Sequence, residues 1–100
     1  MSEDDLGFAP PPFNPDEALQ RLRRELRALG LTEREGRFER GGTAIARAGV
    51  DGAVLQAAIV RRPVRSSPDW QPRHLKSSAE VRDFTAELKR RLAAWGDGED

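Results

Sequence analysis

Cysteine and tyrosine are absent from this sequence of 100 residues, which contains one histidine, one methionine and two tryptophans. Without cysteine the chain cannot form a disulfide framework, a Cys-ligated zinc site or a Cys-ligated iron–sulfur site. The sequence therefore argues against a redox role and against the common structural metal sites.

Long hydrophobic runs are also missing. No apolar stretch approaches the roughly 18 residues that a helix needs to cross a bilayer. The first five residues, Met1 to Asp5, are acidic, whereas a secretory signal peptide begins with basic residues. We therefore expect a cytoplasmic protein that does not associate with membranes.

Residues suited to catalysis are few. His74 is the only histidine and lies in a basic stretch, which is more typical of an exposed side chain than of a metal ligand or a general base. Asp83 and Glu87 are one helical turn apart beside two arginines, as in a surface stabilised by salt bridges. No serine has a suitably spaced partner, and no glycine-rich loop precedes a helix. We expect no enzymatic activity, no cofactor and no metal.

Charge is unevenly distributed along the chain. The 17 basic and 17 acidic residues balance overall, but six of the acidic residues lie outside residues 14–95, so this central segment has a net charge of +6. Only two of the basic residues are lysines, and arginine is the residue that binds phosphate and carboxylate in a bidentate manner. The alternative explanation for the many arginines is the codon usage of a GC-rich genome.

The clearest helix signal follows a proline-rich start. Asn14 can cap a helix, Pro15 fits the first helical position, and Glu17 follows the cap by three residues. Leucines then recur at spacings of three and four up to Leu29, and Gly30 suits the left-handed residue that ends many helices. We predict a helix from Pro15 to about Leu29, with one leucine seam against the core.

Three short segments are predicted as strands. Residues 31–40 surround Phe38 with charged side chains and end at a pair of glycines, and residues 43–48 form the second candidate. A turn at residues 50–52 precedes the third strand, residues 53–62, which contains three β-branched residues. A short helix is the alternative for this third segment because it also contains several alanines.

A long loop and a second helix complete the pattern. Residues 63–76 contain three prolines and no periodicity, and loops of this length are often functional. Ser77 and Glu80 then form a capping box, and apolar residues at helical spacing continue as far as Gly96. A second helix is predicted over residues 78–95.

These elements predict an α+β fold of the order helix, three strands, helix (αβββα). We expect a three-stranded antiparallel meander with both helices on one face of the sheet, because each helix has one apolar face that needs cover. The order resembles that of double-stranded RNA-binding domains. The resemblance lies in the order alone, since the stretch 73–78 before the second helix has basic residues but not the lysine-rich motif of that family.

The chain is predicted to form a single domain with two flanking segments. Residues 1–13 are interpreted as a flexible, acidic, proline-rich arm, residues 14–95 as the α+β domain, and residues 96–100 as a disordered acidic tail. A hundred residues suffice for one core and not for two.

Two functional hypotheses follow from the lack of catalytic groups. The first is a non-catalytic binding or accessory module that acts through protein contacts, including self-association. Its contact surface would be the proline-rich arm, the 63–76 loop or exposed parts of the two helices.

The second hypothesis is binding to the backbone of RNA or DNA. Arginines follow the third strand, further basic residues precede the second helix, and a tryptophan between them could stack on a base. The pI near 6.6 and the acidic ends argue against it. The residues of this hypothetical interface are Arg61, Arg62, Arg65, Trp70, Arg73, His74 and Lys76.

Overall fold

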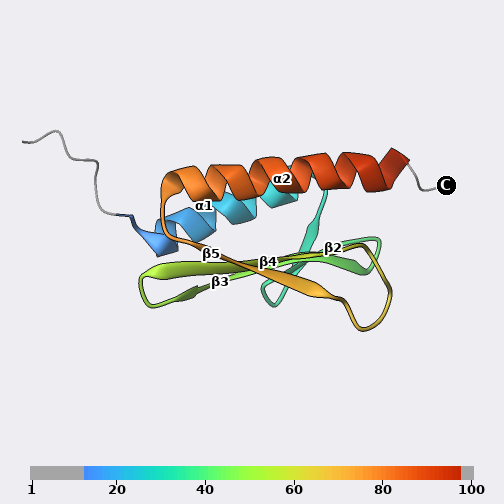
Figure 1. The fold of residues 1–100 in the computed structure, drawn as a ribbon, viewed down its shortest axis with the longest axis horizontal. Coiled ribbons are helices and arrows are strands. Elements are labelled where there is room, and N and C mark those ends of the chain that lie inside the picture. Colours follow the sequence, from blue (N-terminus) through green and yellow to red (C-terminus); the bar gives the residue numbers. More distant parts are fainter. Residues whose placement is uncertain (1–12, 98–100) are drawn as a thin grey trace, which may run out of the picture.

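The computed structural model describes residues 13–97. It contains two helices and five strands (Figure 1). These are α1 (Pro15–Ala28), β1 (Thr32–Arg34), β2 (Arg37–Arg40), β3 (Thr43–Asp51), β4 (Val54–Val60), β5 (Trp70–Leu75) and α2 (Ser78–Asp97). The α+β class is confirmed, but the predicted three-stranded meander is wrong, because the sheet has five strands.

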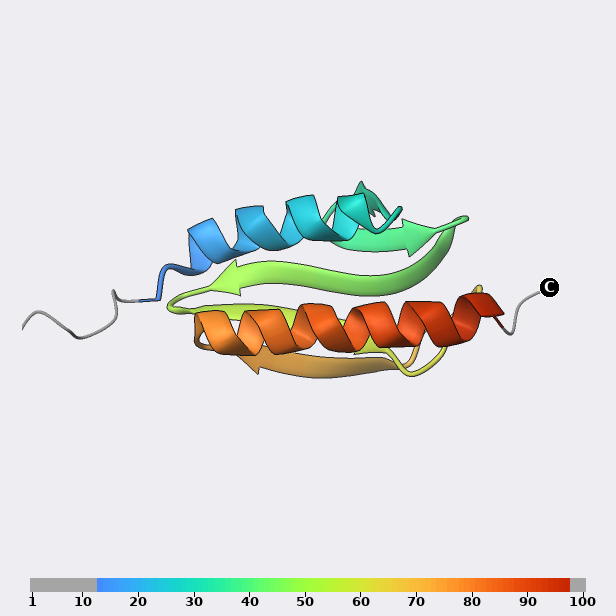
Figure 2. The same ribbon diagram turned by 90° about the horizontal axis from the view of Figure 1, so that it is seen from above.

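All five strands pair with their neighbours in the chain, in the order β1-β2-β3-β4-β5, and every pair is antiparallel. Both helices lie on the same side of this sheet (Figure 1). Seen from above, α1 and α2 lie side by side and run in the same direction (Figure 2). The described residues therefore form two layers, and one face of the sheet has no helix of this part of the chain over it. We call it the open face.

The predicted strand over residues 31–40 is in fact a hairpin. Glu35 and Gly36 have φ angles of 53° and 81°, and two positive φ angles in a two-residue loop are the pattern of a type I′ turn. Such turns favour Asn-Gly or Asp-Gly, so Glu35-Gly36 gave little sequence signal. The hairpin pairs Arg34 with Arg37 and Glu33 with Phe38.

The predicted loop over residues 63–76 is also partly wrong, because its second half forms β5. Arg61 N donates to Asp69 O at 2.9 Å, and in an antiparallel pair such bonded positions alternate with unbonded ones. Along the continuous register of β4 and β5, Pro72 therefore falls at a position whose backbone N–H and C=O groups point away from β4. Proline is tolerated there because β5 is an edge strand.

The predicted helix starts are confirmed by their caps. Asn14 Oδ1 accepts the N–H of Glu17 at 3.2 Å, and Ser77 Oγ accepts the N–H of Glu80 at 3.2 Å. Gly30 follows α1 with a φ of 93°, as a C-terminal cap requires. The helix α2 continues to Asp97, two residues beyond the predicted end.

The prediction of a strand within residues 53–62, with a helix as the alternative, is confirmed, because β4 spans Val54–Val60. The positive φ of Gly52 places the β3–β4 turn at Gly52-Ala53, and β4 begins at Val54. From Leu55 to Val60 every β4 residue except Gln56 is buried. The strand β4 is therefore the most apolar strand of the sheet.

The core lies between the helices and the sheet. Phe38 from β2, Ile45 from β3 and Leu22 from α1 are almost completely buried there. The β2–β3 register shifts at Phe38/Glu39, and such a bulge lets two successive residues of one strand face the same side. Both Ile45 and Ala46 accordingly belong to the core cluster.

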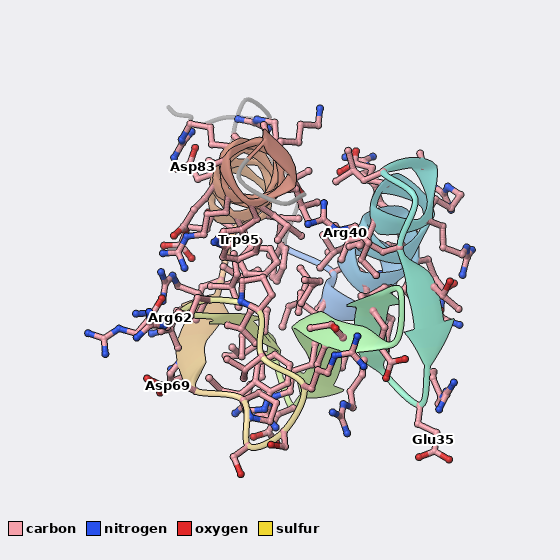
Figure 3. All side chains as sticks on the ribbon, turned by 90° about the vertical axis from the view of Figure 1, so that its right-hand side faces the viewer. Glu35, Arg40, Arg62, Asp69, Asp83 and Trp95 are labelled. Carbon is pink, nitrogen blue, oxygen red and sulfur yellow. The ribbon has the colours of Figure 1, made fainter. Side chains whose placement is uncertain are left out.

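The helices are also fastened to the sheet by polar contacts. Arg23 Nε and Arg27 Nη1 each donate to Glu33 Oε1 at 3.0 Å, which ties α1 to β1. Arg40 reaches up between the helices, while Trp95 lies beneath α2 (Figure 3). The apolar seams of both helices pack against the sheet in one core cluster.

Parts of the predicted flanking segments lie outside the described residues. These are residues 1–12 of the arm and residues 98–100 of the tail. Phe13, the last residue of the predicted arm, is half-buried and packs against the core.

Candidate functional site

The residues predicted for nucleic-acid binding are distributed over four places. Arg61, Arg62 and Arg65 lie in the exposed β4–β5 loop. Figure 3 shows Arg62 and Asp69 on the side of the molecule that β5 forms. The side chains of Arg61 and Asp69 are both about two-thirds exposed, and Arg61 Nη1 lies 3.6 Å from Asp69 Oδ2. This loop keeps its positive charge exposed to solvent.

The next predicted residues lie on opposite faces of the sheet, because successive side chains of β5 point to alternate faces. Arg73 is paired with the core residue Ala57 and faces the helices, whereas Trp70 and His74 face the open side. Lys76 follows β5 at the end opposite the loop, roughly 20 Å from Trp70 at the usual strand rise. The structure thus brings Trp70 and His74 onto one face but separates them from Arg73 and Lys76.

Arg73 belongs to a polar cluster between β5 and α2. Its Nη2 donates to Glu87 Oε2 at 3.0 Å, and Arg91 Nη2 donates to the same oxygen at 2.6 Å. Arg91 Nη1 also donates to Gln71 Oε1 at 2.9 Å and to the carbonyl oxygen of Val60 at 3.1 Å. These contacts fix α2 on the edge of the sheet. Asp83, by contrast, is exposed and lies on the outer side of α2 (Figure 3).

Three arginines lie in a row across the open face. Arg34 of β1 is paired with Arg37 of β2, and Arg37 is paired with Arg47 of β3. All three side chains are exposed. We call Arg34, Arg37 and Arg47 the arginine row. It was not found from the sequence because the alignment depends on the Glu35-Gly36 turn and on the bulge in β3.

Directly opposed like charges destabilise a sheet, so the arginine row is unfavourable for the protein alone. Of the three arginines of the row, only Arg34 has a carboxylate of residues 13–97 within 4 Å, that of Glu39 at 3.9 Å. Arg37 and Arg47 have no ion-pair partner in this part of the chain. The row therefore offers guanidinium groups to an external anion.

Arg47 is held by an aromatic side chain. Its guanidinium carbon lies 4.8 Å from the centre of the Trp70 ring, a distance at which cation–π attraction acts. Val60, the cross-strand partner of Trp70, is completely buried although it faces the open side. The β4–β5 loop curls below the sheet at this end (Figure 1). The open face is thus covered at the end where Val60 and Trp70 lie.

Next to the arginine row the open face is hollowed. A concavity of about 400 Å³ is lined by residues of β2 to β5 and of the β1–β2 turn. In its middle Gly49 is paired with Gln56, which is paired with His74. A Cβ on Gly49 would meet no atom within 4 Å. Neither packing nor a positive φ requires this glycine, and a glycine within a strand often marks a close approach by a ligand.

The edges of the sheet are poor binding surfaces. The outer strand β1 has only three residues. On β5, Pro72 has no N–H, and its outward carbonyl oxygen accepts Arg73 Nη1 at 3.2 Å. Short strands and prolines protect edges against pairing with another chain. The open face is therefore the better candidate for a binding surface.

Within residues 13–97 no group of three His, Asp or Glu side chains is placed to hold a metal ion. The search of the same residues found no helix that is long and apolar enough to span a membrane.

The fold and the site define an α+β protein with one open, arginine-bearing sheet face. Comparisons of the chain with protein-family models, with curated proteins and with solved structures found no match.

Proposed function

We propose that this protein is a small, non-catalytic binding module that contacts another protein through the open face of its sheet. The observation that carries the proposal is the arginine row, in which like charges stand opposite one another on an exposed surface. An arrangement that costs stability, and in which Arg37 and Arg47 have no ion-pair partner among residues 13–97, is best explained by a role in binding.

The charges around the row favour a protein partner over a polyphosphate backbone. Glu35 and Asp51 line the concavity on one side of the row, and Glu39 lies on the other side, near Arg34. A long polyanion crossing this face would meet these carboxylates, whereas the few localised acidic groups of a protein surface would not. Arg73 is already engaged by Glu87, so it adds no free positive charge.

Site-specific photo-crosslinking tests the proposal. A benzoyl-phenylalanine at Gln56 would lie on the open face, and one at Arg90 would lie on the exposed side of α2; both positions are exposed. In cells that express the protein, we expect a defined protein adduct from position 56 and none from position 90. Adducts from position 90 alone would contradict the proposed surface.

Single-stranded nucleic acid is the second candidate partner. It is favoured by Trp70 on the open face, whose ring is in contact with Arg47. The loop that carries Arg61 and Arg62 lies next to Trp70. Bases stack on aromatic rings and on guanidinium planes. Nuclease treatment before crosslinking distinguishes the two candidates. Loss of the adducts after nuclease would replace the protein partner by a nucleic acid.

A further inference from the structure

The arginine row has a defined length and direction. Neighbouring strands lie about 4.8 Å apart, so the backbones at the two ends of the row are separated by roughly 10 Å. The row runs across the strands. A ligand that contacts all three guanidinium groups must therefore lie across the sheet.

The ends of the row differ from its middle. Arg34 is 3.9 Å from Glu39, and Arg47 is stacked on Trp70. The contact with the Trp70 ring restrains the position of the Arg47 guanidinium group, and the N–H groups of a guanidinium match the two oxygens of a carboxylate. Arg37, between them, has neither kind of partner among residues 13–97. We expect Arg37 and Arg47 to contribute most to anion binding.

Given the proposed function, on which this step rests, we infer that the arginine row binds an extended acidic segment of the partner with carboxylates at alternate positions. In an extended chain, side chains two residues apart point to the same side and are separated by about 7 Å. This spacing is intermediate between the roughly 5 Å that separates neighbouring strands of the row and the roughly 10 Å that separates its two ends. The concavity over Gly49 receives the neighbouring side chain, and Gln56 and His74 line it.

Peptide binding measured by fluorescence anisotropy tests this inference on the full chain. The probe is a labelled twelve-residue peptide of alternating Glu and Ser, and the matched peptide has Gln in place of Glu. We expect saturable binding of the Glu peptide, weakened by salt as exposed ion pairs are, and at least about tenfold weaker binding of the Gln peptide.

Four variants locate the binding site. Arg37→Gln and Arg47→Gln are each expected to weaken binding of the Glu peptide about tenfold, because each removes a charge-assisted hydrogen-bonding group. Arg62→Gln makes the same charge change in the exposed loop and is expected to weaken binding less than about twofold, by long-range charge alone. Gly49→Gln fills the concavity without changing charge and is expected to weaken binding severalfold.

Three results would overturn the inference. They are no binding of the Glu peptide, an equal effect of Arg37→Gln and Arg62→Gln, and tighter binding of a ten-nucleotide oligothymidylate than of the peptide at the same arginines. Circular dichroism of each variant confirms that it is folded before its affinity is interpreted. If the Glu peptide does not bind while crosslinking from position 56 gives a protein adduct, this inference is wrong and the proposed function stands. If both fail, the open face is not the binding surface.

Discussion

On β4, Leu55, Ala57 and Ile59 face the helices, while Gln56, Ala58 and Val60 face the open side. The two faces of one sheet thus meet different requirements. The helix-covered face contains closely packed apolar side chains, as stability demands. The open face carries opposed arginines and a glycine within a strand, and both are unfavourable for stability. Residues that a fold does not need are the ones to examine for function.

The largest effect that would sharpen this comparison is expected in the core. Phe38→Ala removes a completely buried side chain of the helix-covered face and is expected to lower the free energy of unfolding by about 3–5 kcal/mol. Gln56→Ala, on the exposed side of β4, is expected to change it by no more than about 0.5 kcal/mol. Urea denaturation measures both. Similar losses in the two variants would mean that the open face is part of the core.

A smaller loss is expected where α2 is fastened to β5. Glu87 accepts from both Arg73 and Arg91 and is half-buried, so Glu87→Gln is expected to cost about 1–2 kcal/mol, between the values for exposed and buried pairs. Asp83→Asn on the outer side of the same helix serves as control. Equal midpoints of thermal unfolding in the two variants would contradict a structural role of the cluster of Arg73, Glu87 and Arg91.

Two glycines should respond in opposite directions to the same substitution. Gly36 has a φ of 81° and a neighbouring carbonyl oxygen 3.4 Å from the site of a Cβ, so Gly36→Ala is expected to destabilise by about 1 kcal/mol or more. Gly49 has open space and no positive φ, so Gly49→Ala is expected to stabilise by about 0.5–1 kcal/mol. Unfolding curves recorded side by side decide this. A loss at Gly49 would reveal a structural need for that glycine.

The smallest effect concerns the arginine row. Arg37→Gln removes the central like charge, and the free energy of unfolding is expected to rise by roughly 0.2–1 kcal/mol at low salt. The gain should shrink as salt is added, because screening weakens exposed charge interactions. Arg62→Gln is the matched control and should show no gain. Destabilisation by Arg37→Gln would indicate that the row is part of the folded structure's own contacts.

The sequence predicted the helices more accurately than the sheet because their signals are local. Asn14, Pro15 and Ser77 act within one turn of the chain, and both helix starts were correct. The missed β5 lacks an alternating apolar pattern, since Gln71 and Arg73 face α2 and are bound there by Arg91 and Glu87. A polar strand whose partners lie on a distant helix resembles a loop until the contacts are known.

The candidate site illustrates the same limit. Trp70 and His74 were selected from the sequence and do share the open face. Arg47 was not selected, because its position opposite Arg37 depends on the extra residue at the bulge of β3. A shift of one residue moves a side chain to the other face of a sheet, so the faces could not be assigned before the strand register was known.

The meander order of the strands also bears on how the chain folds. Each strand pairs with the one next to it in the chain, so the sheet assembles by closing short loops, and such topologies fold faster than those that join distant strands. The helices, in contrast, come from opposite ends of the domain and meet through contacts such as that of Thr85 Oγ1 with Glu25 Oε1 at 3.4 Å. The seam between α1 and α2 is therefore expected to form last and to open first in hydrogen exchange, while the amides of β3 and β4 remain protected until the whole chain unfolds.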